Sequence, residues 1–246
     1  MDLSSSDLSL YGFHSTDFLL NYVQSAGIAE ISPMFISLYN GTIDTTAKLN
    51  LNSVNLPYWV SLKVQGVDLE KLKMDTAFKN KDLGGTLQLE SKVSGFSNDL
   101  SKLSGAGKVS ITNGRLWELN LFQGLGKVLF ARDFANIIFS EGSCNFSIEN
   151  KMLSTDSLRL KSNMANLAGP VAIGFDGSLA ATLDVEVLSD LVPLSGTLKD
   201  ITTAIVGEAG TFGVIKLSGT LKEPKYKFQP AMTNIIKGLK NILMGN

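Results

Sequence analysis

Side chains that commonly carry out catalysis or bind metals are sparse in this chain. His14 is the only histidine and Cys144 the only cysteine among the 246 residues. A lone histidine cannot build a multi-histidine metal site, and a lone cysteine cannot form an internal disulfide or a thiolate metal site. We interpret His14 as a structural residue and Cys144 as a small hydrophobe on the apolar side of a strand. The sequence therefore predicts neither a metal site nor a cofactor.

Other patterns resemble chemical motifs but lack a required part. The stretches 105–108 and 124–127 are rich in glycine and end in lysine. Both lack the upstream glycine and the following Ser or Thr of a phosphate-binding loop. Asp184 and Glu186 share one side of an expected strand, and a solvated charged face explains them better than an acid/base pair. We therefore predict that the protein is not an enzyme, and we keep a hydrolase or transferase as the least favoured alternative.

Composition and charge limit the remaining classes of function. The chain is 44% hydrophobic and has 22 Lys and Arg against 23 Asp and Glu. This content allows a sizeable core, and the near-neutral charge without a long basic run predicts no nucleic-acid partner. Residues 1–10 have neither the cationic nor the apolar part of a secretory signal. No apolar run reaches the roughly 20 residues that span a bilayer. We expect a chain that is soluble as given or cut from something larger.

Strict alternation of apolar and polar residues is the main structural signal. Ile43, Leu49 and Leu51 alternate with polar residues, and Val60 and Val64 do the same after a turn at 53–57. This pattern predicts a long antiparallel hairpin with one apolar face and one wet face. The same alternation predicts further strands near 87–93, 103–112, 144–148, 153–161, 165–175, 179–187, 212–221 and 226–228. The fold class is therefore mainly β with a few short amphipathic helices.

Turn and cap residues divide these segments. Tight turns are expected at Asn40-Gly41, Asn113-Gly114, Asn150-Lys151, Asp176-Gly177 and Glu223-Pro224. Helical spacing predicts amphipathic helices over 15–27, 116–130 and 230–246, a short helical turn capped by Asp68, and broken helical pieces over 188–206. The expected organisation is an N-terminal strand and helix in 1–40, a β domain in 41–230 and a C-terminal amphipathic capping helix in 231–246.

The apolar face of such a sheet has to be hidden from water. The sheet can fold on itself, close into a barrel, accept helices, or hold an apolar ligand. The face is dominated by Leu, Val and Ile and shows no recurring polar group. A defined small ligand normally needs a few placed polar contacts, whereas hydrocarbon chains do not. Alternation alone leaves a filled core and an open groove as alternatives.

Several segments resemble the C-terminal region of the AsmA family, including its AsmA/TamB-like members. In chain order they read GTIDTTAKLNLNSVNLPYWVSLKVQG at 41–66, VDLEKL at 67–72, LGGTLQLESKVSG at 83–95, LSGAGKVSITNGRLWELNLFQGL at 103–125 and SGTLKEPKYKFQP at 218–230. The resemblance covers roughly residues 41–230. It implies a protein of the bacterial periplasm or cell envelope related to bridge-like lipid transfer proteins. In these a long curled β-sheet forms a groove or open half-barrel that shields phospholipid acyl chains between membranes.

The resemblance also implies which residues and partners matter. Members usually begin with an inner-membrane anchor and a long preceding β region, so we expect this chain to be a C-terminal fragment. Membrane contact would then come from those missing parts or from the C-terminal helix, and protein partners in the envelope are possible. The residues expected to touch acyl chains are Ile43, Leu49, Leu51, Val60, Leu62, Val64, Leu87 and Leu89. The alternative is a structural or assembly-factor domain for outer-membrane biogenesis, with a fully packed interior and no lipid.

Overall fold

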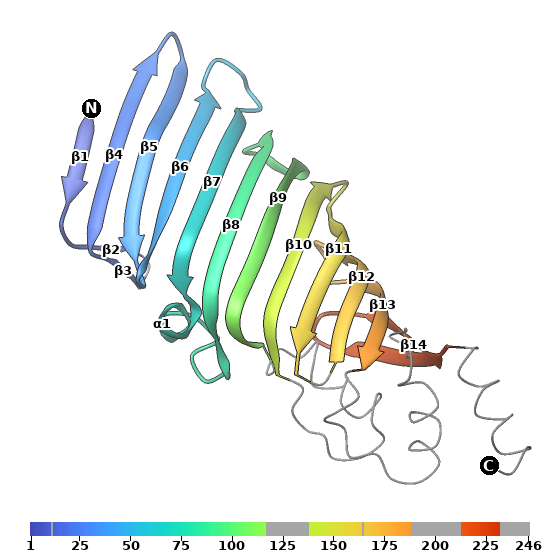
Figure 1. Cartoon of the computed structure of the whole chain (residues 1–246). Helices are drawn as coiled ribbons and strands as arrows, with labels where there is room; N and C mark the ends of the chain where they lie inside the picture. Colours follow the sequence, from blue (N-terminus) through green and yellow to red (C-terminus); the bar gives the residue numbers. More distant parts are fainter. Residues whose placement is uncertain (11, 117–137, 164, 188–212, 232–246) are drawn as a thin grey trace, which may run out of the picture.

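One long antiparallel sheet dominates the molecule. The computed structural model describes residues 1–10, 12–116, 138–163, 165–187 and 213–231. Within these residues, thirteen strands pair side by side in the order β1-β4-β5-β6-β7-β8-β9-β10-β11-β12-β13-β14-β15, and β2 pairs with β3 separately (Figure 1). β1 and β15 lie at opposite edges, so the sheet is not closed into a barrel. The predicted fold class, a mainly β protein with a long antiparallel, curled sheet, is confirmed.

The strands follow each other across the sheet almost as they do along the chain. Their bounds are β1 (Asp2–Ser5), β2 (Leu8–Leu10), β3 (Phe13–Ser15), β4 (Asp17–Ser25), β5 (Ile28–Leu38), β6 (Gly41–Asn50), β7 (Pro57–Asp68), β8 (Leu83–Phe96), β9 (Asp99–Leu116), β10 (Phe139–Glu149), β11 (Met152–Ser162), β12 (Ala165–Gly174), β13 (Leu179–Val187), β14 (Gly213–Gly219) and β15 (Pro224–Pro230). At the C-terminal end the sheet turns, and β14 runs across the direction of β12 and β13 (Figure 1). β5 and β6 pair along their length, so the sheet is continuous through residues 40 and 41.

Tight turns join most neighbouring strands in the described part of the chain. Between β5 and β6 the two turn residues are Tyr39 and Asn40, with φ of 50° and 65°, one position earlier than the expected Asn40-Gly41, because Gly41 already begins β6. Between β10 and β11 they are Asn150 and Lys151, with φ of 52° and 61°. Two successive positive φ values are typical of the hairpin turn whose twist matches that of the strands. These turns alternate the strand direction and keep each apolar set on the same side of the sheet.

The turn expected at Asn113-Gly114 is not present. Both residues lie inside β9, which runs to Leu116. Asn113 does have a positive φ, 51°, but it sits where the pairing with β8 shifts between Gly84 and Thr86. The residue pair that favours a hairpin turn thus forms an irregularity within a long strand, because β8 continues alongside it as a pairing partner.

The helix expected over residues 15–27 is also wrong. Residues 17–25 form β4, which pairs with β5 and with β1. Leu19 and Val23, which set the helical spacing, are 47% and 52% exposed, whereas Leu20 and Tyr22 are partly buried. The same segment therefore also alternates with a period of two. Pairing on both sides favours the extended form, and its aromatic and β-branched residues suit a strand.

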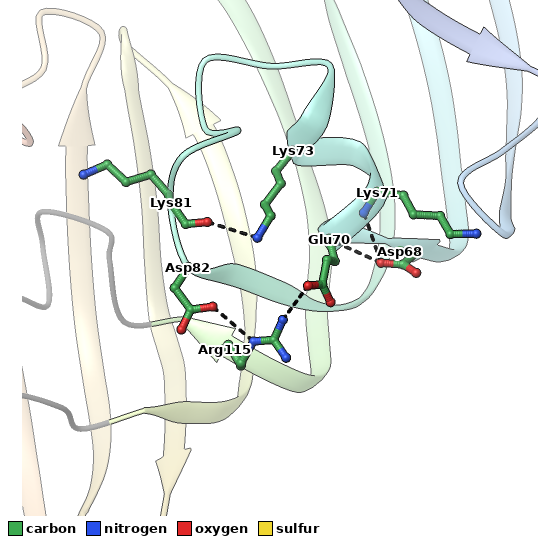
Figure 2. A network of polar contacts seen from close by, with 7 residues as sticks. All are labelled: Asp68, Glu70, Lys71, Lys73, Lys81, Asp82 and Arg115. Atoms are coloured by element: carbon green, nitrogen blue, oxygen red, sulfur yellow. Dashed lines mark hydrogen bonds and ion pairs between the residues drawn. The ribbon is translucent and has the colours of Figure 1, made fainter.

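The short helix α1 (Leu69–Met74) confirms the turn expected after Asp68. The Asp68 carboxylate accepts hydrogen bonds from the backbone N–H groups of Glu70 and Lys71, which caps the first turn. Leu69, the first residue of α1, is the buried residue of this helix. Figure 2 shows the Arg115 guanidinium next to α1, where it forms ion pairs with Glu70 at 2.8 Å and with Asp82 at 3.1 Å. These contacts hold α1 against the end of β9.

Some of the predicted helices fall outside the described residues. A helix is expected over 116–130. Leu116, its first expected position, is instead the last residue of β9, and the other positions lie outside the described residues. The helical pieces over 188–206 lie outside the described part, as do residues 232–246 of the C-terminal helix.

Candidate functional site: the apolar face of the sheet

Strand register brings the alternating apolar residues onto one side of the sheet, which we call the apolar face. Paired positions form continuous rows across many strands. One row crosses β4 to β10 through Phe18, Ile36, Ile43, Val64, Leu89, Val109 and Cys144. The next row runs through Leu20, Met34, Thr45, Leu62, Ser91, Gly107 and Phe146. The first row has no polar side chain apart from the Cys144 thiol, and the second includes Thr45 and Ser91, so the face is predominantly apolar across these strands.

The residues predicted to contact acyl chains lie on this face with one exception. Those on β6, β7 and β8 share it, and Val64 is the most buried of them, at 6% exposure. The others on the face are partly buried: Ile43, Leu49, Val60, Leu62, Leu87 and Leu89. Leu51 lies beyond the end of β6, in the turn, and is 40% exposed. The structure therefore brings seven of the eight predicted residues together on one face.

The sequence analysis missed the part of the face on β4 and β5. Leu20, Met34 and Ile36 continue the rows that cross β6. They were overlooked because β4 was assigned to a helix and β5 has no clean alternation. A register shift between Ile31 and Met34 interrupts the period of two in β5. The alternation of Phe18, Leu20 and Tyr22 was the signal that could have revealed them.

Aromatic rings cover glycines of neighbouring strands on the apolar face. A Cβ atom built on Gly107 would lie 2.6 Å from Cζ of Phe146, and one built on Gly95 would lie 2.8 Å from the hydroxyl oxygen of Tyr58. The rings thus occupy space that another side chain would need. Glycines under cross-strand aromatics let the ring pack onto the backbone. The rings of Tyr58 and Phe146 therefore lie close to the backbone of the neighbouring strand.

Exposure changes along the sheet. From β4 to β10, which we call the open stretch, most apolar side chains of the face are partly exposed. From β11 to β15, which we call the filled end, the corresponding side chains are buried against one another. The buried cluster joins residues of the filled end to Leu116 at the end of β9 and Phe139 at the start of β10. Its other members are Leu160, Leu167, Val171, Leu179, Ala181, Leu183, Val185, Ile215 and Leu217. The alternatives of an open groove and a packed core thus each describe one part of the same face.

The opposite face is polar and carries ion pairs between neighbouring strands. Lys48 pairs with Glu30 at 3.2 Å and Lys108 pairs with Glu90 at 3.1 Å, each directly across a strand pair. Lys161 and Glu141 form a third pair, at 3.0 Å. Exposed pairs of this kind contribute little stability. Their value here is diagnostic, because they show which side of the sheet faces water.

Hollows between side chains also lie on the polar face. One of about 480 Å³ is lined mainly by polar residues of β7 to β11, among them Gln88, Lys108 and Arg159. Another, of about 730 Å³, includes Lys63 and Asn145. Because the lining is mixed and solvent-facing, neither hollow has the apolar lining with a few polar contacts that typifies a small-molecule site.

The groups first considered for chemistry do not form a reactive cluster in the described residues. His14 lies on β3 and is exposed, and Asp184 is exposed on β13. The Glu186 carboxylate accepts a hydrogen bond from the Asn166 amide at 3.0 Å. Partial burial raises the pKa of the Cys144 thiol, which disfavours the reactive thiolate. The described residues hold no group of three or more His, Cys, Asp or Glu placed to bind a metal ion.

The fold and its apolar face place this protein among those built on one open antiparallel sheet, with a shape consistent with a curled groove. A comparison with family models agrees, since the model of the AsmA family matches residues 3–176. This is more than half of the chain, and the protein belongs to the AsmA family. The family is generally non-enzymatic and envelope-associated. Searches of curated proteins and of solved structures gave no significant match. Among the described residues, none of the helices is long and apolar enough to cross a membrane.

Proposed function

We propose that this protein is a non-enzymatic lipid-binding domain whose open stretch shields phospholipid acyl chains during transfer between membranes. The observation that carries the proposal is the continuous apolar face that remains partly exposed over seven strands, β4 to β10. Monomeric proteins rarely expose large contiguous apolar surface without a binding role. Family membership supports an envelope-associated role in lipid transport or assembly.

The energetics suit such a role. Moving hydrocarbon into water costs about 0.8 kcal/mol per methylene, so a whole lipid tail costs on the order of 10 kcal/mol. An apolar face removes most of that cost while the head group stays in water. No acid, base or nucleophile is needed for this task, so an enzyme is not our proposal. The location we propose is the periplasm or cell envelope, with an inner-membrane anchor in the full-length parent.

A second candidate is a structural or assembly-factor domain for outer-membrane biogenesis, acting through protein partners. The filled end favours it, because there the apolar residues pack as an ordinary core. Ala165, Val185 and Ile215 are completely buried. If the open stretch were covered in the same way by a protein partner, no lipid would be required.

Two substitutions at neighbouring positions separate these candidates. Leu62 lies on the apolar face of β7 and Ser61 lies on the polar face. A Leu62→Asp substitution places a carboxylate where the proposal puts hydrocarbon, and burying an unpaired charge is costly. We expect phospholipid co-purified with this variant, measured by mass spectrometry, to fall by about tenfold, which corresponds to about 1.4 kcal/mol. Ser61→Asp, the matched control, should retain the lipid content of the unmodified protein.

The same measurement can reject the proposal. Protein purified from a membrane-containing lysate that carries no phospholipid, and that takes none from phosphatidylcholine vesicles, would favour the assembly role. Equal lipid loss in Leu62→Asp and Ser61→Asp would likewise show that the apolar face is not the binding surface. Circular dichroism should confirm that both variants retain the sheet, since each position is accessible to solvent.

A further inference from the structure

The two parts of the apolar face meet at β10. Gly142 on β10 leaves a gap in the face, and side chains from both sides fill it. A Cβ atom built on Gly142 would lie 3.2 Å from Cδ2 of Leu160 and 3.3 Å from Cδ1 of Leu116. Both leucines are 4% exposed and belong to the buried cluster. The space above the face is therefore already occupied by protein at this point.

Beyond β10 several of the described apolar side chains of the face are almost completely buried. Leu167 is 1% exposed, Leu183 is 3% exposed and Ile215 is completely buried. The register places Leu183 opposite Ile215, and Tyr226 and Phe228 of β15 pack against the same cluster. Inserting a hydrocarbon chain here would require side chains of the core to separate. Overfilling a packed core forces side chains out of their preferred rotamers and is therefore unfavourable.

We propose that the acyl-chain site is closed at its C-terminal end: tails lie across β4 to β10, and Leu116 and Leu160, which both lie over Gly142, form the stop that separates them from the filled end. This inference rests on the proposed function and deepens it. It implies that lipid tails enter and leave through the open side or the β1 edge and do not pass through the end formed by β11 to β15.

The dimensions suit the proposed ligand. Seven strands in the open stretch have six spacings of about 4.8 Å, which gives a length of about 29 Å. A single tail occupies about half of the roughly 30 Å hydrocarbon core of a bilayer. One tail lying across the strands would therefore cover about three strand spacings, and the open stretch has room for it before the stop is reached.

Photochemical mapping tests the position of the stop. The whole chain would be loaded with a phosphatidylcholine that carries a diazirine at the end of one acyl chain, irradiated and digested, and the adducts located by mass spectrometry. We expect adducts on the open stretch, at positions such as Met34 and Leu89, and none on Leu167 or Ile215. Adducts of similar yield on both parts would overturn the stop while leaving the proposed function intact. Loaded protein that forms no adduct anywhere on the face would overturn both.

Thiol labelling gives an independent measurement that does not depend on the photoprobe. In a Cys144→Ser background, Val93→Cys reports on the open stretch and Ala181→Cys on the filled end. Saturation with phosphatidylcholine should slow maleimide labelling of Val93→Cys by about fivefold, because access controls thiol reactivity. Ala181→Cys should label slowly with or without lipid. If Ala181→Cys labels as fast as Val93→Cys in lipid-free protein and lipid protects both, tails reach past the stop and the inference fails.

Discussion

Two leucine-to-alanine substitutions, one in each part of the apolar face, should differ in their effect on stability. Leu167 is 1% exposed in the filled end, whereas Leu89 is partly exposed in the open stretch. Leu167→Ala removes the equivalent of three methylenes, worth about 2.4 kcal/mol at about 0.8 kcal/mol each. The cavity left behind adds to this cost, so the free energy of unfolding should fall by about 3–5 kcal/mol.

Leu89→Ala should cost much less in lipid-free protein. The side chain is already in partial contact with water, so only part of the transfer energy is lost. Water also fills the vacated space, so no empty cavity remains. We expect a loss of about 1 kcal/mol. Lipid content should change in the opposite sense, with Leu89→Ala binding less phospholipid and Leu167→Ala retaining it as long as the protein is folded.

Urea unfolding of delipidated protein, followed by circular dichroism, measures both values on the same scale. The unmodified protein and a control on the polar face of β9, Ser110→Ala, set the reference. Equal losses for Leu89→Ala and Leu167→Ala would refute the reasoning, because they would show that the open stretch is packed as tightly as the filled end. In that case the assembly role would be the better account of the face.

Three further predictions concern single contacts. Gly107→Val should destabilise the fold by more than about 2 kcal/mol in urea unfolding, because the new side chain overlaps the Phe146 ring, whereas Ala106→Val on the polar face should be nearly neutral. Burial and the hydrogen bond to Asp75 raise the pKa of Tyr39 to about 12. The contribution of protonated Tyr39 to the free energy of unfolding should therefore be complete below about pH 10, the pKa of an ordinary tyrosine, and should be lost as the pH rises to about 12. In an ultraviolet titration, Tyr39→Phe should therefore remove a late tyrosine step, and an unchanged curve would contradict the assignment. Asp68→Ala should cost about 1 kcal/mol through loss of the cap of α1, and Asp68→Asn should recover most of it.

The sequence predicted the part of the fold that depends on local periodicity. In β6 and β7 apolar residues recur at every second position, so the apolar face of the hairpin followed directly. Ile43 and Val64, both predicted on that face, lie directly opposite each other. The predicted cap at Asp68 is also found, because a cap depends only on residues within one helical turn.

The wrong assignments depend on partners that are distant in sequence. β4 fits both a period of two and a helical spacing, and its pairing with β1 and β5 decides between them. Asn113 has the positive φ that its type favours, but whether this makes a turn or an irregular strand depends on β8. The difference between the open stretch and the filled end could not be predicted either. Leu89 and Leu167 sit in equally alternating segments, but Leu167 belongs to the buried cluster with residues of β13 and β14, whereas Leu89 does not.

The order of the strands has a consequence for how this sheet can change in length. From β5 to β15 each strand pairs only with the strands immediately before and after it. Most contacts are therefore local along the chain, which favours folding by successive hairpins. Insertion of one complete hairpin would preserve the direction of every later strand, whereas insertion of a single strand would reverse them. A protein built in this way can lengthen or shorten in steps of two strands, about 10 Å each, without redesign of the rest.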